Sequence, residues 1–292
     1  MLIAEKDILE NTLKPILRKR VITRLGKNFN KKEAKIIEPE SMSRSISVLS
    51  EFLDIARQFD IQSPIVIATG VARDARNRNT FIDLIDKKLG HTVKVITGKE
   101  ESHLTCRGVL SSLTHRAEPV LIFDCGGGST EFIWTNSEYE KSISIKLGAV
   151  ILTDDYLITD PPKDEEINEI ISQIDSIFKV KLEYIKKLCK ETFSLVGTGG
   201  AIMSVAAIIH GIQETEFDKK LNGLLIKRED IELLFTKIKR MPEEERLNLT
   251  GLEPGREDIV AAGTIMVMKI MDYFEKDEIL ISYADLLEGI LL

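Results

Sequence analysis

The stretch LIFDCGGGSTEFIW, Leu121–Trp134, sets three consecutive glycines between two apolar runs. Asp124 closes the first run and Glu131 opens the second. Such runs on both sides of a glycine-rich turn predict two strands joined by a tight connection. Glycines can adopt positive φ and let the backbone approach closely, so successive N–H groups can converge on an anion. The loop therefore predicts a phosphate-binding turn, or else a hairpin whose glycines serve the fold alone.

The glycine loop differs from the two most familiar phosphate loops. The chain contains no G-x-x-x-x-G-K-[ST] pattern, and these glycines do not fit G-x-G-x-x-G. Both of those loops lead into a helix, whereas this one leads into the β-type run Glu131–Thr135. Asp124 and Glu131 add hard carboxylate oxygens, which Mg²⁺ requires beside a phosphate. The two acids therefore favour the phosphate interpretation.

Apolar periodicity around the loop predicts an α/β protein. Strands are expected at Leu2–Ala4, Leu17–Thr23, Ile65–Thr69, Thr92–Ile96, Val120–Asp124, Glu131–Thr135, Ser142–Lys146, Phe193–Val196 and Glu278–Ser282. Helices are expected at Ser41–Phe59, Thr80–Leu89, Glu100–Leu113, Lys163–Lys187, Ala201–Ile209, Arg228–Arg240, Pro242–Leu247, Glu257–Phe274 and Ala284–Leu292. Helices between buried strands imply parallel pairing, and both halves repeat the order strands, long helix, strand, helix. This repeated order therefore predicts a duplicated α/β unit.

Length and composition suit a water-soluble protein of two domains. The chain has 292 residues, 43% of them hydrophobic, and lacks the apolar run of about 18 residues that a membrane span needs. The start, Met1–Glu5, has no secretory signal, and Cys106, Cys125 and Cys189 show neither disulfide nor zinc spacing. We therefore expect a cytoplasmic protein with reduced cysteines and no membrane association.

Charge is unevenly distributed along the chain. The formal net charge of −7 argues against nucleic acid as a partner. The segment from residue 14 to residue 35 is nevertheless basic, with Glu33 as its single acid and with Lys14, Arg18, Lys19, Arg20, Arg24, Lys27, Lys31, Lys32 and Lys35 as its bases. Such a segment is either ordinary solvated surface or a local attraction for a polyanion.

Charged residues also follow two of the expected strands in the first half. Arg73, with Arg76 and Arg78 nearby, comes just past the carboxyl end of a buried strand, where α/β sheets bind ligands. Guanidinium groups suit phosphate, although Arg73 could equally pair with Asp74 as ordinary surface. Glu100 and Glu101 follow the next strand, either as acids that suit a helix N-terminus or with one of them as a general base.

A second glycine segment, GTGG at Gly197–Gly200, precedes an expected helix. It either holds a nucleotide or allows tight helix packing, and the pattern alone favours packing.

Taken together, the motifs resemble the exopolyphosphatase / guanosine pentaphosphate phosphohydrolase family, within the superfold of actin, sugar kinases and chaperone ATPases. The matching pieces run in order over nearly the whole chain. They are RVITRLG at Arg20–Gly26, ATGVARDARNRNTF at Ala68–Phe81, VITGKEESHLTCRGV at Val95–Val109, DCGGGSTEF at Asp124–Phe132, LVGTGGAIMSVAA at Leu195–Ala207 and GREDIVAAG at Gly255–Gly263.

The resemblance implies a role for each matching position. Glu101 matches the base that activates water, Asp124 an acid at the metal and phosphate site, and Glu131 a further catalytic or metal carboxylate. Arg73 matches a phosphate-contacting arginine. The second phosphate loop of the family corresponds to Gly126, Gly127, Gly128, Ser129 and Thr130. Contacts to guanosine tetraphosphate and pentaphosphate are implied, more loosely, near Arg20, Gly197, Gly199 and Arg256.

The resemblance also implies the architecture and the cofactor. It implies an actin-like, ribonuclease H-like duplicated fold with a cleft between two domains that open and close. The expected domains are residues 1–118, joined by the C-terminal helix 284–292, and residues 119–283. The expected metal is Mg²⁺ or Mn²⁺, and the expected assembly is a homodimer.

Two features depart from the family pattern. Family members begin with a strand and a loop of the type D-x-G-S-N-S, which supplies another metal-binding Asp and a phosphate-binding Ser. Here Met1–Ala4 matches the strand after that loop, so we expect a chain without the first phosphate loop. The family's L-R-E-G reads Leu286–Gly289 here, with Leu287 in place of the arginine.

Three functions are consistent with these observations. The leading hypothesis is metal-dependent hydrolysis of a terminal phosphoanhydride bond, in inorganic polyphosphate or guanosine pentaphosphate, with Glu101 as the base. A chain without the first loop could instead bind polyphosphate or a guanosine tetra- or pentaphosphate without hydrolysing it. A small-metabolite kinase of the same superfold is the third hypothesis, which the lack of a recognisable acceptor site disfavours.

Overall fold

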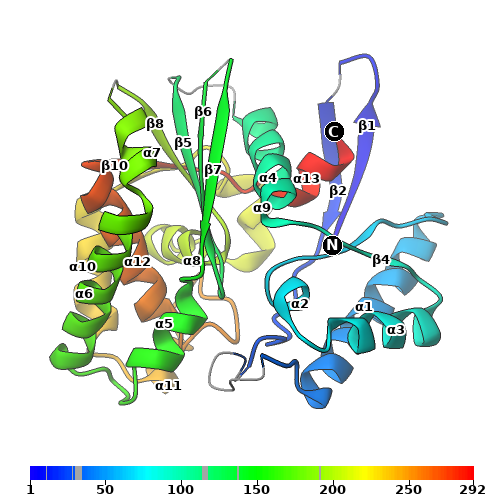
Figure 1. Cartoon of the computed structure of the whole chain (residues 1–292), viewed down its shortest axis with the longest axis horizontal. Helices are drawn as coiled ribbons and strands as arrows, with labels where there is room; N and C mark the ends of the chain where they lie inside the picture. Colours follow the sequence, from blue (N-terminus) through cyan, green and yellow to red (C-terminus); the bar gives the residue numbers. More distant parts are fainter. Residues whose placement is uncertain (11, 28, 30–34, 114–117, 137, 191) are drawn as a thin grey trace. The chain divides into compact units, whose positions relative to one another are not determined.

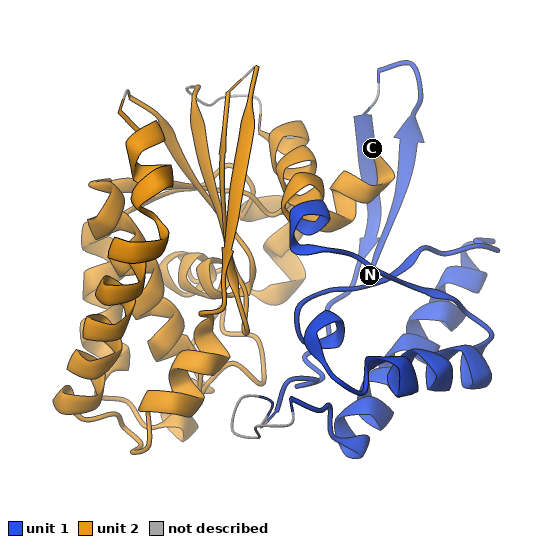
Figure 2. Cartoon of the chain, in the orientation of Figure 1, with its two compact units in different colours: residues 1–101 blue, residues 102–292 orange. Residues whose placement is uncertain are grey.

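The computed structural model describes residues 1–10, 12–27, 29, 35–113, 118–136, 138–190 and 192–292. Contacts divide the chain into two compact units, Met1–Glu101 and Ser102–Leu292 (Figure 2). The boundary between the units falls inside the helix Gly98–Ser112. The two domains expected from the sequence, residues 1–118 with 284–292 and residues 119–283, stay a prediction. Within the described ranges, no helix is long and apolar enough to cross a membrane.

The second unit is built on a six-stranded sheet with the order β7-β6-β5-β8-β10-β9. The strands β5, β6 and β7 pair antiparallel, β5, β8 and β10 pair parallel, and β9 adds an antiparallel edge. Their bounds are β5 Val120–Cys125, β6 Thr130–Thr135, β7 Glu140–Ile145, β8 Ser194–Thr198, β9 Leu225–Lys227 and β10 Glu278–Ile281. Each of these strands except β9 was predicted from the sequence. The prediction missed β9 because it is an edge strand of three residues.

Helices cover both faces of this sheet, which explains why β5 is apolar at successive positions. Leu121 and Phe123 face a core shared with α6 (Asp164–Lys181), α8 (Gly200–His210) and α12 (Val260–Phe274) (Figure 1). Val120 and Ile122 face the opposite core, to which Cys106 and Val109 of α4 (Gly98–Ser112) contribute. All four β5 side chains are buried.

The remaining helices of this unit are mostly short. They are α5 Ala149–Tyr156, α7 Glu183–Leu188, the 3₁₀ turn η1 Glu214–Glu216, α9 Phe217–Lys220, α10 Arg228–Ile238, α11 Glu243–Arg246 and α13 Leu286–Leu291. The prediction of one helix over Lys163–Lys187 was wrong, because α6 stops at Leu182 and α7 begins after it. The Leu182 side chain is fully buried in the core, so tertiary packing interrupts a helix that the periodicity alone would continue.

The helix α13 packs closely on α4 through a pair of glycines. A Cβ on Gly289 would overlap the carbonyl of Leu104, and a Cβ on Gly108 would overlap the carbonyl of Asp285. A capping box starts α13, in which Asp285 accepts from Leu287 N at 2.8 Å and Glu288 accepts from Asp285 N at 2.9 Å. Leu287 therefore occupies the first turn of a well-capped helix.

Among its described residues, the first unit contains two short sheets, three helices and the first turn of α4. The strands β1 (Leu2–Asp7) and β2 (Thr12–Arg18) pair antiparallel, and β3 (Val66–Ala68) and β4 (Val93–Val95) pair parallel. The helices are α1 Pro39–Gln58, α2 Gly70–Asp74 and α3 Arg78–Leu89. A small core joins α1, α2, α3, β3 and β4. Lys31 and Lys32 of the basic segment lie outside the described residues.

The expected strand Leu17–Thr23 was wrong beyond Arg18. Asp7 Oδ1 accepts from Leu9 N at 2.9 Å and from Glu10 N at 3.1 Å, which forms a turn closed by the aspartate side chain. Asp7 pairs with Thr12 and Leu2 pairs with Arg18, so β2 extends from Thr12 to Arg18. The residues from Lys19 to Arg24 are irregular.

Candidate active site

A polar row crosses the sheet of the second unit at the carboxyl ends of β5 and β8. Asp124 on β5 pairs with Thr198 on β8 and with Glu131 on β6, and Glu131 in turn pairs with Ser144 on β7. Directly paired residues project from the same face of a sheet. Glu131 is only 3% exposed, and its Oε1 accepts a hydrogen bond from Ser144 Oγ at 2.7 Å. The fold therefore places two carboxylates side by side within the predicted motif.

Backbone hydrogen bonds connect the glycine loop between β5 and β6 to the start of the helix α5. Gly126 O accepts from Ala149 N at 3.1 Å, and Gly127 O accepts from Val150 N at 2.9 Å. Gly126 N closes the turn by donating to Ser129 O at 3.0 Å. The loop carbonyls thus satisfy the first N–H groups of a helix, which would otherwise lack acceptors.

Three backbone donors of this loop remain for a ligand. The N–H groups of Gly127, Gly128 and Ser129 donate to no acceptor among the described residues. These residues are half-buried, so the donors lie at the surface of the unit rather than in its core. Successive N–H groups without a protein acceptor are a donor array of the kind that can bind a phosphate.

The reason for glycine in this loop is space rather than unusual dihedral angles. None of Gly126, Gly127 and Gly128 belongs to the described glycines with positive φ, so that part of the expectation was wrong. A Cβ on Gly127 would instead lie 2.9 Å from Val150 Cγ2, at the start of α5. The backbone of Gly127 thus approaches a helix of the same unit closely, while its approach to an anion stays a prediction.

Thr130, which was expected to bind phosphate, is fully buried. Its hydroxyl donates a hydrogen bond to Leu147 O at 2.7 Å. This bond links β6 to the connection before α5. The fold engages this hydroxyl internally.

The glycines of the GTGG segment make room for close neighbours, as the packing interpretation predicts, and nucleotide binding stays a prediction. A Cβ on Gly197 would lie 2.7 Å from Phe123 Cζ, so this glycine serves packing. Gly199 has φ of 89°, and a Cβ there would overlap Asp124 Oδ1. A Cβ on Gly200 would overlap the guanidinium of Arg256. Gly199 and Gly200 thus let an anionic and a cationic side chain lie against the N-terminus of α8, where the helix dipole favours the carboxylate.

Arg256 is held in place by Glu253, a residue that the sequence analysis missed. Arg256 Nε donates to Glu253 Oε2 at 2.7 Å, and the two side chains are only 14% and 6% exposed. Glu253 precedes the motif that contains Arg256, so no recognised pattern included it. The buried acid orients the guanidinium while its other nitrogens lie near Gly200.

The thiol of Cys125 reports the charges around the site. The pKa of Cys125 is raised to about 12, mainly by burial and also by the charges of Asp124 and Glu131, against the hydrogen bond of Thr130 and the charge of Arg256. The thiol therefore stays protonated and acts as a packed core atom. Asp124, Glu131 and Arg256 are the charged residues that act on this thiol.

The first unit carries a second cluster, which joins Arg73 to Glu101. Arg73 follows β3 and Glu101 follows β4, and parallel pairing brings the carboxyl ends of these strands together. Arg73 Nη1 donates to Glu101 Oε2 at 2.6 Å, with exposures of 18% and 13%. Burial lowers the pKa of Arg73, but the hydrogen bond and charge of Glu101 and the charge of Asp74 outweigh it, so the pKa is raised.

The neighbouring acids Glu100 and Glu101 have different environments. Glu100 Oε2 accepts from Thr97 N at 2.8 Å while Thr97 Oγ1 accepts from Glu100 N at 3.2 Å, which forms a capping box at the start of α4. The backbone hydrogen bond from Thr97 lowers the pKa of the exposed Glu100. The helix N-terminus thus accounts for Glu100, whereas Glu101 is half-buried against an arginine.

The residues expected near a guanosine nucleotide fall in both units. Arg20 lies in the irregular segment after β2 in the first unit, while Gly197, Gly199 and Arg256 belong to the second. Of the latter three, Gly199 and Arg256 lie at the polar row and Gly197 in the core.

A model of the Ppx/GppA phosphatase family matches residues 2–292. The chain belongs to this family. It is 28% identical to a Ppx/GppA family member from Aquifex aeolicus, whose structure aligns with 99% of this chain and 91% of that chain at a TM-score of 0.78. The α/β architecture is the actin-like ATPase fold of the Ppx/GppA proteins.

Two curated relatives of the Ppx/GppA chain differ in length. A bifunctional 3-dehydroquinate synthase/phosphatase of Fusobacterium nucleatum is 30% identical over 99% of this chain, which spans 43% of that protein. Exopolyphosphatase 2 of Mycobacterium tuberculosis is 27% identical over 87% of this chain and 82% of its own length.

The donor set at the polar row suits a hard divalent cation of the kind expected in a Ppx/GppA protein. In the part of the chain that the structure describes, no three His, Cys, Asp or Glu side chains form a metal site by themselves. Asp124 and Glu131 supply two carboxylates on neighbouring strands. Mg²⁺ commonly binds through one or two carboxylates, with water and substrate phosphates completing its octahedron. The residues present therefore fit such an ion.

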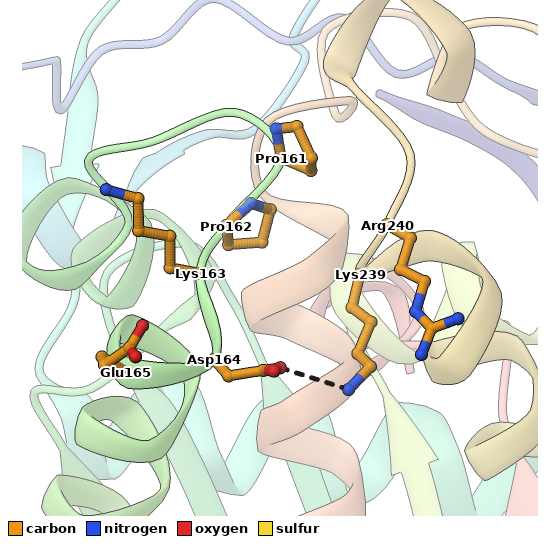
Figure 3. A pocket seen from close by; sticks show the side chains of 7 residues that line it. All are labelled: Pro161, Pro162, Lys163, Asp164, Glu165, Lys239 and Arg240. Atoms are coloured by element: carbon orange, nitrogen blue, oxygen red, sulfur yellow. Dashed lines mark hydrogen bonds and ion pairs between the residues drawn. The ribbon is translucent and has the colours of Figure 1, made fainter.

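A separate hollow of about 330 Å³ lies between the N-terminus of α6 and the end of α10 (Figure 3). Lys239 Nζ and Asp164 Oδ1 form an ion pair at 3.3 Å within it. Its lining consists of Pro161, Pro162, Lys163, Asp164, Glu165, Lys239 and Arg240, and includes none of the candidate site residues.

Proposed function

We propose that this chain hydrolyses the terminal phosphoanhydride bond of inorganic polyphosphate or of guanosine pentaphosphate. Membership of the Ppx/GppA phosphatase family and the similarity to exopolyphosphatase 2 support this proposal. One observation carries it: three backbone N–H groups without an acceptor in the described structure, at Gly127, Gly128 and Ser129, lie between the carboxylates Asp124 and Glu131. This arrangement suits a phosphate with a divalent cation.

In this proposal the glycine loop binds the terminal phosphate through its N–H groups, and Ser129 adds a hydroxyl. Asp124 and Glu131 hold Mg²⁺ or Mn²⁺, which neutralises charge on the phosphate oxygens when bound. The hydrogen bond from Ser144 keeps the Glu131 carboxylate in one orientation. The proposal covers both substrates, because no feature of the sequence favours polyphosphate over guanosine pentaphosphate.

Glu101 acts as the general base. Its carboxylate accepts a proton from water, the water oxygen bonds to the terminal phosphorus, and the bond from phosphorus to the bridging oxygen breaks. The products are orthophosphate and a chain or nucleotide that is one phosphate shorter. Arg73 holds Glu101 in position and offers positive charge to the phosphate as negative charge spreads in the transition state.

The difference between Glu100 and Glu101 provides a matched test. We expect Glu101→Gln to fold normally and to release phosphate about 10²–10⁴-fold more slowly, because a general base contributes a factor of that size. Glu100→Gln changes the neighbouring acid in the same way, and we expect it to retain activity within about twofold because glutamine also supports a capping box.

The measurement is phosphate release with Mg²⁺ from polyphosphate and from guanosine pentaphosphate. Wild-type rates for Glu101→Gln would remove Glu101 from the mechanism. Tight binding of either substrate by a wild-type chain that releases no phosphate would instead identify a binding protein. The expected homodimer and the cytoplasmic location stay predictions.

A further inference from the structure

Arg246 is a buried charge that the proposed mechanism does not use. It ends the short helix α11, and its side chain is only 2% exposed. A buried guanidinium is costly unless hydrogen bonds and charges compensate for the lost water. Its partners therefore indicate which parts of the fold it serves.

The guanidinium of Arg246 joins three separate segments of the second unit. Nε donates to Ile238 O at 3.3 Å at the end of α10, and Nη1 donates to Glu257 O at 3.0 Å. Nη2 lies 3.4 Å from Asp160 Oδ1 in the connection between α5 and α6. Burial lowers the pKa of Arg246, and the nearby charges of Asp160, Glu243 and Asp258 oppose that shift.

One of these segments is the loop that carries Arg256. Glu257, whose carbonyl accepts from Arg246, follows Arg256 directly. The Glu257 side chain accepts from Gly255 N at 2.8 Å, on the other side of Arg256. Glu253 holds the Arg256 side chain, whereas Arg246 holds the loop backbone.

We propose that Arg246 is a positioning residue for Arg256. By fixing the carbonyl of Glu257, it keeps the Arg256 guanidinium against the start of α8, close to Asp124. This inference rests on the proposed function and on the expectation, stated above from the family resemblance, that a guanosine nucleotide binds near Arg256. A rigid support is effective because a displacement of about 1 Å in a binding group can cost up to about 10²-fold.

A double-mutant cycle distinguishes positioning from general stabilisation. Arg246→Lys keeps the charge and loses the planar set of donors, and Arg256→Gln removes the guanidinium at the site. Both single variants and the double variant are made in the Glu101→Gln background, so that binding is measured without turnover. Arg240→Lys is the matched control, because Arg240 lines the hollow and is exposed.

Asp160→Asn provides a second route if Arg246→Lys fails to fold. Asp160 is 37% exposed, so the change leaves the core intact while it removes the charge opposite Arg246. Kd for polyphosphate of defined length and for guanosine pentaphosphate is measured for every variant, together with the melting temperature.

We expect Arg256→Gln to weaken binding by about 10–100-fold, since hydrogen bonds between charged groups are lost. Arg246→Lys should weaken it by about tenfold and Asp160→Asn by about threefold, as supporting residues commonly do. In the Arg256→Gln background, Arg246→Lys should change Kd by less than about twofold. Arg240→Lys should bind as the parent chain does.

Two results would overturn the inference while the proposed function stands. One is unchanged affinity in folded Arg246→Lys and Asp160→Asn; the other is an equal loss of affinity with and without Arg256. If the wild type releases no phosphate and the parent chain binds neither substrate, the proposed function fails and the inference fails with it.

Discussion

The two glycine segments of the second unit follow neighbouring parallel strands, yet they use glycine for different reasons. After β5, Gly127 makes room for the helix α5, and its backbone angles are ordinary. After β8, Gly199 adopts positive φ and makes room for the Asp124 carboxylate. Both segments end at the same edge of the sheet, because parallel strands share a direction. The reason why each position requires glycine therefore lies in the atoms that pack against it in the fold, rather than in the sequence motif around it.

The largest effect should come from Gly199→Ala. Alanine at φ of 89° is strained, and its Cβ would overlap Asp124 Oδ1, so the carboxylate has to move. We expect a loss of about 3 kcal/mol in the free energy of unfolding and a fall of about 10²-fold in phosphate release. Urea unfolding and phosphate release measure the two effects. Near-normal activity would show that the position of Asp124 is unimportant.

Gly127→Ala should have an intermediate effect. Its Cβ would lie 2.9 Å from Val150 Cγ2, and a valine is stiff about χ1, so α5 has to shift. We expect a loss of about 1–2 kcal/mol in stability and about tenfold in phosphate release. Val150→Ala in the same chain is the control, because it removes the clashing methyl groups. Failure of this second change to restore activity would contradict the explanation by space.

Ser144→Ala tests β7, the second strand after the first glycine segment. It removes the donor at 2.7 Å from the buried Glu131 carboxylate. We expect about 1–2 kcal/mol lower stability, since hydrogen bonds to charged groups contribute about this much. We also expect half-maximal phosphate release to require a higher Mg²⁺ concentration, because Glu131 loses its fixed orientation. Ser142→Ala, two residues earlier on the same strand, is the control.

The smallest effect should come from Gly126→Ala. The nearest atom to its Cβ would be Ser129 O at 3.3 Å, and its φ is not positive. We expect stability to change by less than about 0.5 kcal/mol, because the loss of chain entropy in the unfolded state offsets the tight contact. A loss as large as that of Gly127→Ala would show that the whole loop, and not one contact, requires glycine.

Periodicity was sufficient for most of the fold because the buried strands and long helices have strong local patterns. The strands β5, β6 and β10 and the helices α1, α4 and α12 lie close to their predicted ranges. The helix α5 was not predicted, although it supports the glycine loop, because its four apolar residues come first and its polar residues follow, so no helical period appears. The break at Leu182 and the register of β2 were also missed, since each depends on contacts outside the local sequence.

The sequence by itself determined the family, the α/β architecture and the chemical character of the site, because glycines, acids and arginines occur there in recognisable motifs. Only the tertiary structure showed the different environments of Glu100 and Glu101, the buried hydrogen bond of Thr130, and the contacts of Glu253, Ser144 and Arg246. The physical reason is distance along the chain. Ser144 lies 13 residues from Glu131, and Arg246 lies 86 residues from Asp160, so neither contact leaves a local pattern in the sequence.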